Sequence, residues 1–286
     1  NIRSKIKVME YHASPFMVNV GYWPTIEEIP DWSFDGSSTK QARGSKSDCV
    51  LKPQRLYNHP CKDNHFFVLC EVFNADGTPH ATNNRWELRQ LDSAIVDDYW
   101  ISFEQEYFIY DSKTKQPLGW DLQMEKQGKY YCGVGTSNVS GRILSEEHLD
   151  LCIKSDIGIT GTNAEVAKGQ WEYQVFQKDA LRACDDLIVG NYMLMKHAER
   201  HNLDIELHPK PVKGDWNGSG CHINFSTRQM RDVGGKHLFT KICDRLGEKH
   251  KQHMEVYGKY NHERLTGLHE TQHHSRFSYG VSDRGA

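Results

Sequence analysis

The chain has 286 residues, which is enough for a sizeable hydrophobic core and for about two domains of ordinary size. Its 35 basic and 38 acidic side chains leave a formal net charge of −3, without the clustered positive charge typical of nucleic-acid-binding proteins. No apolar run approaches the roughly 18 to 20 residues that cross a bilayer, and the first residues lack the apolar core of a secretory signal. We therefore expect a cytoplasmic protein whose partners are small molecules or copies of itself, with no nucleic acid and no membrane.

Residues 1–82 are rich in strand-forming residues and in turns. The segment 66–73, FFVLCEVF, has the composition of a buried strand, and the turn residues Asn-Ala-Asp-Gly at 74–77 end it. Asp35 precedes Gly-Ser-Ser in the segment 32–39, where an Asp-Gly pair on its own indicates only a turn. Because no strong helical period appears here, we predict a small β-rich domain over residues 1–82.

Residues 83–286 alternate between helical and strand patterns. Apolar stripes and capping residues predict helices over 146–154 with Ser145 as cap, over 179–201, and from about 236 to 257. The stripe of the second helix comprises Leu181, Cys184, Ile188, Tyr192 and Met195. Alternation of polar and apolar residues predicts strands over 170–176, 203–207 and 221–225. We therefore predict a larger α/β domain over residues 83–286 and an α+β fold class for the chain.

The segment 100–110, WISFEQEYFIY, reads as a strand with two carboxylates in its middle. Because side chains alternate along a strand, Glu104 and Glu106 point the same way. Glu165 and Glu172 repeat the pattern, since Glu172 lies in a predicted strand among aromatic residues. Hard cations such as Mg²⁺ take oxygen ligands, so carboxylates that converge on one pocket would explain all four glutamates. Taken singly, each glutamate is better explained by a solvated sheet face.

A glycine-rich loop precedes two further polar residues. His222 and Asn224 share one face of the predicted strand 221–225 and could add an imidazole ligand and an amide. The loop 213–222, KGDWNGSGCH, would let backbone N–H groups approach a ligand closely, although an ordinary hairpin connection explains it equally well. It has neither Walker A spacing nor the Gly-x-Gly-x-x-Gly pattern.

Arginines follow near the end of the chain. The segment 261–270, NHERLTGLHE, is followed by Arg276 and Arg284. Arginine binds carboxylates and phosphates through paired hydrogen bonds, so arginines near acidic metal ligands suit a phosphorylated acidic substrate. Alone, most arginines are surface residues.

Taken together, these segments resemble one family, the glutamine synthetases, and in particular its type II, eukaryotic-like branch with the bacterial members that share it. The resemblance covers nearly the whole chain and rests on ordered motifs at 32–39, 103–107, 130–135, 161–166 with 170–173, 217–222 with 224–226, and 264–270. It implies a β-grasp domain over 1–82 and a catalytic domain over 83–286 of the glutamine synthetase and ATP:guanido-kinase type. It also implies a homo-oligomer of two stacked rings, a decamer, with active sites between neighbouring subunits.

The resemblance assigns roles to the residues that match the family motifs. It implies Mg²⁺ or Mn²⁺ as the metal, held nearest glutamate by Glu106, Glu165 and Glu172, and nearest ATP by Glu104 and His222. Substrate binding is implied for Asn217, Gly218, His222 and Arg264. Nucleotide binding is implied for Trp100, Asn224 and Ser226. Catalytic roles are implied for Asp35, Glu270 and Arg284.

The implied reaction is ATP-dependent formation of L-glutamine from L-glutamate and ammonium, a step of nitrogen assimilation. Because a carboxylate does not yield hydroxide to ammonia, ATP first converts the γ-carboxylate to an acyl phosphate. Arg284 would stabilise the transferring phosphoryl group. Asp35 of the next subunit would bind ammonium and take its proton, and Glu270 on a closing flap would complete that site and exclude water.

The chain departs from the family pattern in the flap, where residues 271–276 read TQHHSR, and the family continues beyond Ala286. We therefore interpret the chain as truncated at both ends. Two alternatives stay open: a non-catalytic ring-forming homologue, and a glutamate ligase that uses another amine. The retained metal ligands and arginines favour an enzyme, and Asp35 with Glu270 favours ammonium.

Overall fold

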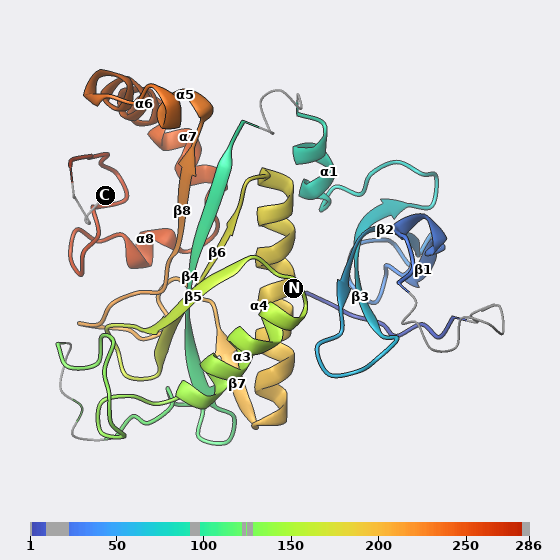
Figure 1. The fold of residues 1–286 in the computed structure, drawn as a ribbon, viewed down its shortest axis with the longest axis horizontal. Helices are drawn as coiled ribbons and strands as arrows, with labels where there is room; N and C mark the ends of the chain where they lie inside the picture. Colours follow the sequence, from blue (N-terminus) through green and yellow to red (C-terminus); the bar gives the residue numbers. More distant parts are fainter. Residues whose placement is uncertain (1, 10–22, 92–97, 122–123, 125–127, 282–286) are drawn as a thin grey trace.

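The computed structural model describes residues 2–9, 23–91, 98–121, 124 and 128–281. Within them, a three-stranded sheet and a five-stranded sheet are accompanied by helices that lie between and beside the sheets (Figure 1). This arrangement confirms the predicted α+β class, with a small sheet domain next to a larger domain. The boundary at residue 82 stays a prediction.

The smaller sheet is antiparallel and has the strand order β1-β2-β3. Its third strand coincides with the apolar run that predicts a strand at 66–73. The strands are β1 (Trp32–Asp35), β2 (Asp48–Asn58) and β3 (Phe66–Asn74), preceded by the 3₁₀ helix η2 (Ile26–Glu28) and followed by α1 (Asn84–Arg89).

The larger sheet is centred on one long strand, β4 (Trp100–Asp111), and all its pairings are antiparallel. One edge of β4 pairs with β6, which pairs in turn with β5. The other edge is shared end to end, because β8 pairs with the first half of β4 and β7 with the last residues. The remaining strands are β5 (Ile159–Ala164), β6 (Gln170–Gln177), β7 (Leu203–Glu206) and β8 (Cys221–Ser226).

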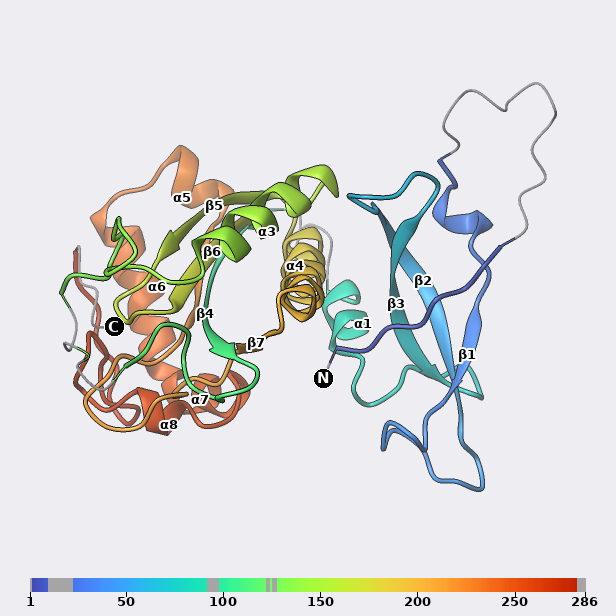
Figure 2. The same ribbon diagram turned by 90° about the horizontal axis from the view of Figure 1, so that it is seen from below.

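Helix α4 (Ala180–Arg200) lies between the two sheets, as Figure 2 shows. On one side it packs with Tyr107 and Tyr173 of the larger sheet, and on the other with Tyr57 of the smaller one. Asp179 caps the helix, because its side chain accepts a hydrogen bond from Arg182 N. Helix α3 (Arg142–Lys154) packs beside α4. Both helices therefore cover one face of the larger sheet.

The last helices lie on the opposite side of the larger sheet from the small sheet (Figures 1 and 2). They are α5 (Arg228–Asp232), α6 (Lys236–Glu248), α7 (His250–Val256) and α8 (Asn261–Arg264). The pattern at 236–257 predicts one helix, whereas the structure divides it at Lys249 into α6 and α7. Among the described residues, no helix has the length and apolar character needed to cross a membrane.

Two other helix predictions are wrong in detail. Helix α3 begins at Arg142, so Ser145 is not its cap; the Ser145 side chain is buried, and its Oγ lies 2.6 Å from Thr162 Oγ1 in β5. The predicted apolar stripe of α4 is its less buried side, with Ile188 44% exposed. The reason is that α4 is covered from two directions, so the sides that pack also carry polar residues such as Asn191.

A cluster of buried charges joins the small sheet to α4. Arg85 lies 2.6 Å from a Glu71 oxygen and 2.7 Å from an Asp185 oxygen, and the two carboxylates are only 0% and 2% exposed. Arg55 and Arg89 supply further ion pairs to the same two acids. Buried charges are tolerated only when they are paired, so these arginines are needed to hold the acids at the interface.

We expect Arg85→Met to lower the free energy of unfolding by about 3 kcal/mol, because it leaves two buried carboxylates short of a partner. Urea denaturation followed by circular dichroism measures the change. Lys115→Met is the matched control, since it breaks an ion pair to Asp204 whose side chains are 69% and 53% exposed. That loss should stay below about 1 kcal/mol. Equal losses in both variants would contradict the structural role of the buried cluster.

Candidate active site

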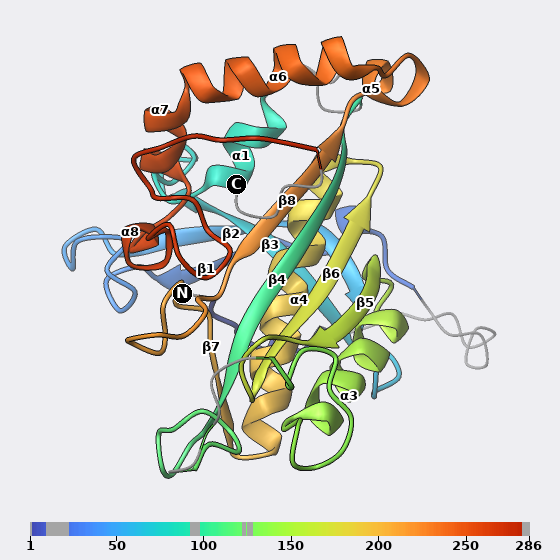
Figure 3. The same cartoon turned by 90° about the vertical axis from the view of Figure 1, so that its left-hand side faces the viewer.

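The candidate site lies on one face of the larger sheet, here called the carboxylate face, which carries Glu104, Glu106 and Glu172 on the side away from α4. Figure 3 shows β8, β4 and β6 side by side in front of α4. The strand register pairs Glu106 with Glu172 and Glu104 with His222. Cross-strand partners share a face of the sheet, so Glu172 and His222 lie on the same face as Glu104 and Glu106. Glu104 and Glu106 point the same way, as their alternation in the sequence predicts.

Glu106 is the most enclosed of these carboxylates. Its Oε2 accepts hydrogen bonds of 3.0 Å from both Gln170 Nε2 and Gly220 N, and its Oε1 lies 3.3 Å from His222 Nε2. Burial raises the pKa of Glu106, but the His222 hydrogen bond, the Arg264 charge and the Gly220 N–H outweigh it and lower the pKa below its usual value. Glu106 is therefore a stabilised anion.

Glu165 and Glu172 lack comparable compensation. Burial, followed by the charges of Glu106 and Glu172, raises the pKa of Glu165 to about 8, although Asn163 Nδ2 donates to it at 2.9 Å. Burial also raises the pKa of Glu172, against a hydrogen bond from Gln174. Carboxyl groups that crowd each other in this way favour either a proton or a cation between them.

Glu104 and His222 continue the carboxylate face toward the start of β4. Asn224 Nδ2 donates to Glu104 Oε1 at 2.6 Å. The hydrogen bond to Glu106 raises the pKa of His222. The imidazole thus lies between carboxylates of one strand, in a position from which it can bind either a proton or a metal ion.

The glycine-rich loop packs around Arg264 at the end of α8. A Cβ atom on Gly218 would lie 2.6 Å from Arg264 Cγ, and one on Gly220 would lie 2.8 Å from Arg264 Nη2. Gly218 O also accepts from Gln170 Nε2 at 2.9 Å, and Asn217 is buried beside it. Glycine is required here because it admits the arginine beside Glu106, which brings Arg264 to 3.5 Å from His222 Nε2.

Trp100 and Ser226 occupy the far end of the same face, where they are direct partners in the β4-β8 register. Arg231 lies over the Trp100 ring at 4.2 Å and donates to Ser226 Oγ at 3.1 Å. Asn224 lies between this pair and Glu104. From Trp100 to Glu106 the face extends about 20 Å, so it can offer different groups to different parts of its ligands.

Asp35 is not brought to the carboxylate face of its own chain. It ends β1, in the small sheet on the far side of α4 (Figure 2). Hydrogen bonds from Ser37 and Ser38 lower the pKa of Asp35 to about 2 and fix its exposed carboxylate. The segment that reads as an ordinary turn is thus an ordered anionic loop.

One other predicted residue, Glu270, is also not placed against the carboxylates. Glu270 is exposed in the loop after α8 and has a left-handed backbone, with φ of 60°. Arg284 lies outside the described residues.

Sequence reasoning missed the residues that hold the carboxylates in place. Gln170 bridges Glu106 to the glycine loop, Gln174 and Asn163 bind the other two acids, and Arg231 covers Trp100. Two were predictable in part, because Gln170 and Gln174 share the face of Glu172 by alternation. Nothing in the sequence singles out Arg231 among the 35 basic residues.

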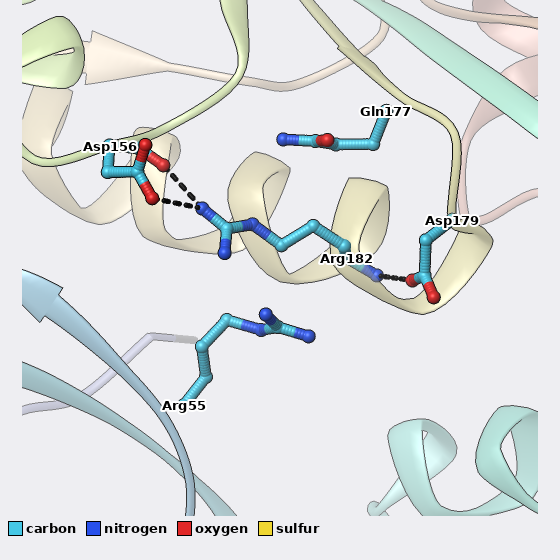
Figure 4. Close-up of a pocket in the computed structure, with 5 residues that line it drawn as sticks. All are labelled: Arg55, Asp156, Gln177, Asp179 and Arg182. Atoms are coloured by element: carbon cyan, nitrogen blue, oxygen red, sulfur yellow. Dashed lines mark hydrogen bonds and ion pairs between the residues drawn. The ribbon is translucent and has the colours of Figure 1, made fainter. Parts of the chain in front are cut away.

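A separate cavity of about 400 Å³ lies between β2 and the start of α4, lined by Arg55, Asp156, Gln177, Asp179 and Arg182 (Figure 4). Its arginines are engaged: Arg55 pairs with Asp185, and Arg182 with Asp186 at 2.8 Å. The cavity therefore belongs to the junction between the sheets and not to the carboxylate face.

The raised pKa of Glu165 gives a testable pH dependence. Between pH 4.5, its usual pKa, and about pH 8, Glu165 keeps its proton in the folded chain but loses it in the unfolded chain. Its contribution to stability is therefore full below pH 4.5 and is lost as the pH rises to about 8. In a chelating buffer, Glu165→Gln should flatten the fall in melting temperature between about pH 5 and about pH 9. The corresponding change in the free energy of unfolding is no more than about 5 kcal/mol.

The control for this measurement is Glu146→Gln, which removes an exposed carboxylate of α3 that is 58% accessible. It should keep the slope of the unaltered chain in differential scanning calorimetry. Superimposable pH profiles for Glu165→Gln and the unaltered chain would show that burial and neighbouring charges do not raise the pKa of Glu165.

The chain was compared with known proteins. It matches the family model "Glutamine synthetase, catalytic domain" over residues 80–249. It is 46% identical over 294 residues to a glutamine synthetase of Bradyrhizobium diazoefficiens, covering 100% of this chain and 80% of that protein. With a glutamine synthetase of Yarrowia lipolytica the identity is 43%, over 100% of this chain and 76% of the relative.

A cryo-EM structure of Plasmodium falciparum glutamine synthetase has a similar fold. The TM-score is 0.66 at 18% identity, over 86% of this chain and 57% of that chain. The sequence matches extend over the whole chain, and they include the strand and loop that carry Glu106 and Gly220. The chain therefore belongs to the glutamine synthetase family.

Proposed function

We propose that this protein is an ATP-dependent ligase that makes L-glutamine from L-glutamate and ammonium through γ-glutamyl phosphate. Membership of the family supports the reaction, and one observation carries it to this chain. Glu106, Glu165 and Glu172 are gathered on one face of a sheet, with Arg264 and His222 beside them. That set of groups suits a substrate carboxylate and a transferring phosphoryl group, both of which are anions handled with cations.

The metal sites of the reaction are proposed on the carboxylate face. Glu106, Glu165 and Glu172 would hold an Mg²⁺ or Mn²⁺ ion, and Glu104 with His222 a second. The residues fit such ions because they are oxygen-rich and because burial and mutual repulsion raise the pKa of Glu165 and of Glu172. When bound, the ions supply charge neutralisation for the phosphates and for the carboxylates themselves.

The substrates are proposed to lie along this face. Arg264 is beside Glu106 and would bind the α-carboxylate of glutamate, with Asn217 and Gly218 forming the wall next to it. Trp100, Asn224 and Ser226 would contact the nucleotide at the other end of the row. Arg284 is proposed to stabilise the phosphoryl group during transfer, so that the reacting carboxylate is activated between Arg264 and the nucleotide end.

The ammonium site is proposed to form between subunits of a ring, in two stacked rings of a decamer. The position of Asp35 on the far side of α4 supports this arrangement, because Asp35 can serve a carboxylate face only in another copy of the chain. An anion with a pKa of about 2 attracts ammonium but is a weak proton acceptor. Burial against the neighbouring subunit would raise that pKa, and Glu270 would complete the enclosure. We also propose that the protein is located in the cytoplasm.

The first test measures ADP release by the chain with Mg²⁺ and ATP, with glutamate and ammonium added separately and together. Release that needs both substrates is expected. If an organic amine supports more ADP release than ammonium does, that amine and not ammonium is the substrate. A ring-forming protein that binds no Mg²⁺-ATP would be the non-catalytic homologue, and the ligase proposal would then be abandoned.

Mixed rings test the contribution of Asp35 from a neighbour. Asp35→Asn and Glu106→Gln should each lower kcat by a factor of about 10² to 10⁴. Co-assembled in equal amounts, they should regain about a quarter of the unaltered activity, since about a quarter of the interfaces join two intact halves. Glu106→Gln mixed with Glu172→Gln is the control, because both changes damage the same half. Equal inactivity of the two mixtures would place Asp35 outside the shared site.

A further inference from the structure

A second group of ionisable side chains lies outside the candidate active site, where α3 packs against the C-terminal half of α4 (Figure 1). Glu147 comes from α3, and His197 and His201 come from successive turns of α4. The ligand atoms of these residues all lie within 4.8 Å of one another. In the part of the chain that the structure describes, this is the one group of three or more His, Cys, Asp or Glu residues gathered so closely.

The distances within this group are close to those of a metal site. Glu147 Oε2 lies 2.7 Å from His197 Nε2 and 2.9 Å from His201 Nε2, and the two nitrogens are 3.3 Å apart. Ligand atoms about 2.0 to 2.1 Å from a tetrahedral Zn²⁺ ion are about 3.3 Å from one another. The two imidazoles already have that separation, and the carboxylate oxygen needs to move by only about half an ångström to make room for an ion.

The burial of the three side chains also suits a bound ion. The side chain of His197 is 10% exposed, whereas those of His201 and Glu147 are 34% and 47% exposed. An ion can therefore enter from solvent, while one ligand is fixed by packing. The spacing of His197 and His201 by four residues places both rings on one side of a helix, so α4 supplies two ligands without any change of backbone.

We propose that Glu147, His197 and His201 bind a zinc-type divalent ion that joins α3 to α4. Two imidazoles and one carboxylate form a mixed nitrogen and oxygen set, which suits Zn²⁺ or Co²⁺ and is poorly suited to Mg²⁺. Water completes the coordination. The ion is structural in this position, since it links two helices that both cover the sheet face opposite to the carboxylates.

This site is distinct from the metal sites proposed for the reaction. Its ligands come from α3 and α4, whereas Glu104 and Glu106 point to the other side of β4. Ion binding here should therefore change the stability of the helix pair while ADP release stays unchanged. The inference does not depend on the proposed ligase activity.

The experiment uses the full chain, freed of metal by chelation and then held in excess Mg²⁺ to occupy the carboxylate face. Co²⁺ is titrated as the probe, because tetrahedral Co²⁺ absorbs visible light far more strongly than the octahedral aqueous ion. We expect a strong visible band that saturates at one Co²⁺ per chain and disappears when Zn²⁺ is added. Zn²⁺ should also raise the melting temperature of the metal-free chain.

Two variants and one control assign the band. His201→Asn and Glu147→Gln each remove a ligand from a part-exposed position, and both should lose the band and the Zn²⁺-dependent rise in melting temperature. His237→Asn removes an exposed histidine from α6 and should behave as the unaltered chain. Circular dichroism establishes that the variants are folded, and unchanged ADP release separates this site from the catalytic one.

The proposal is overturned by either of two results. The unaltered chain could show only the weak absorption of octahedral Co²⁺, in which case Glu147 simply accepts hydrogen bonds from the two imidazoles. Alternatively, a strong band could persist in both His201→Asn and Glu147→Gln, which would place the ion at other residues.

Discussion

The alternation of side chains along β4 is the constraint on which the rest of the structure depends. Successive residues of a strand point to opposite faces, so Tyr107 and Ile109 enter the core with α4 while Glu104 and Glu106 cannot. A shift of one residue in the β4-β6 register would place carboxylates in the apolar core and tyrosines on the carboxylate face. The packing of the domain and the composition of the site are thus fixed together.

Two pairs of largely enclosed acids differ in their partners. Asp185 and Glu71 are surrounded by arginines of their own chain, so their charges are matched and their role is to join the small sheet to α4. Glu165 and Glu172 instead lie near other carboxylates and amide groups, and burial together with these neighbouring charges raises their pKa. Acids that the chain leaves uncompensated are the ones suited to a cation from outside.

The position of α4 explains why Asp35 lies far from the carboxylate face of its own chain. One helix packs against both sheets, which holds the carboxylate face at one side of the molecule and β1 at the other (Figure 2). Because a single chain cannot bring these together without breaking the core, a site that uses both has to be shared between chains. The same helix carries His197 and His201 on a third side, where α3 meets it.

The sequence by itself predicted strands β3, β4, β6, β7 and β8 and the alternation of side chains along them, because period-two alternation is a local property of the chain. Glu104 and Glu106 were therefore assigned to one face of their strand, and His222 and Asn224 to one face of theirs, while the ordered motifs indicated the family. Only the tertiary structure decided what surrounds those groups. The packing of Arg264 into the glycine loop, the role of Gln170, and the burial of α4 from two sides join residues far apart in the chain. Such contacts depend on how the elements pack, and no local pattern of residues contains that information.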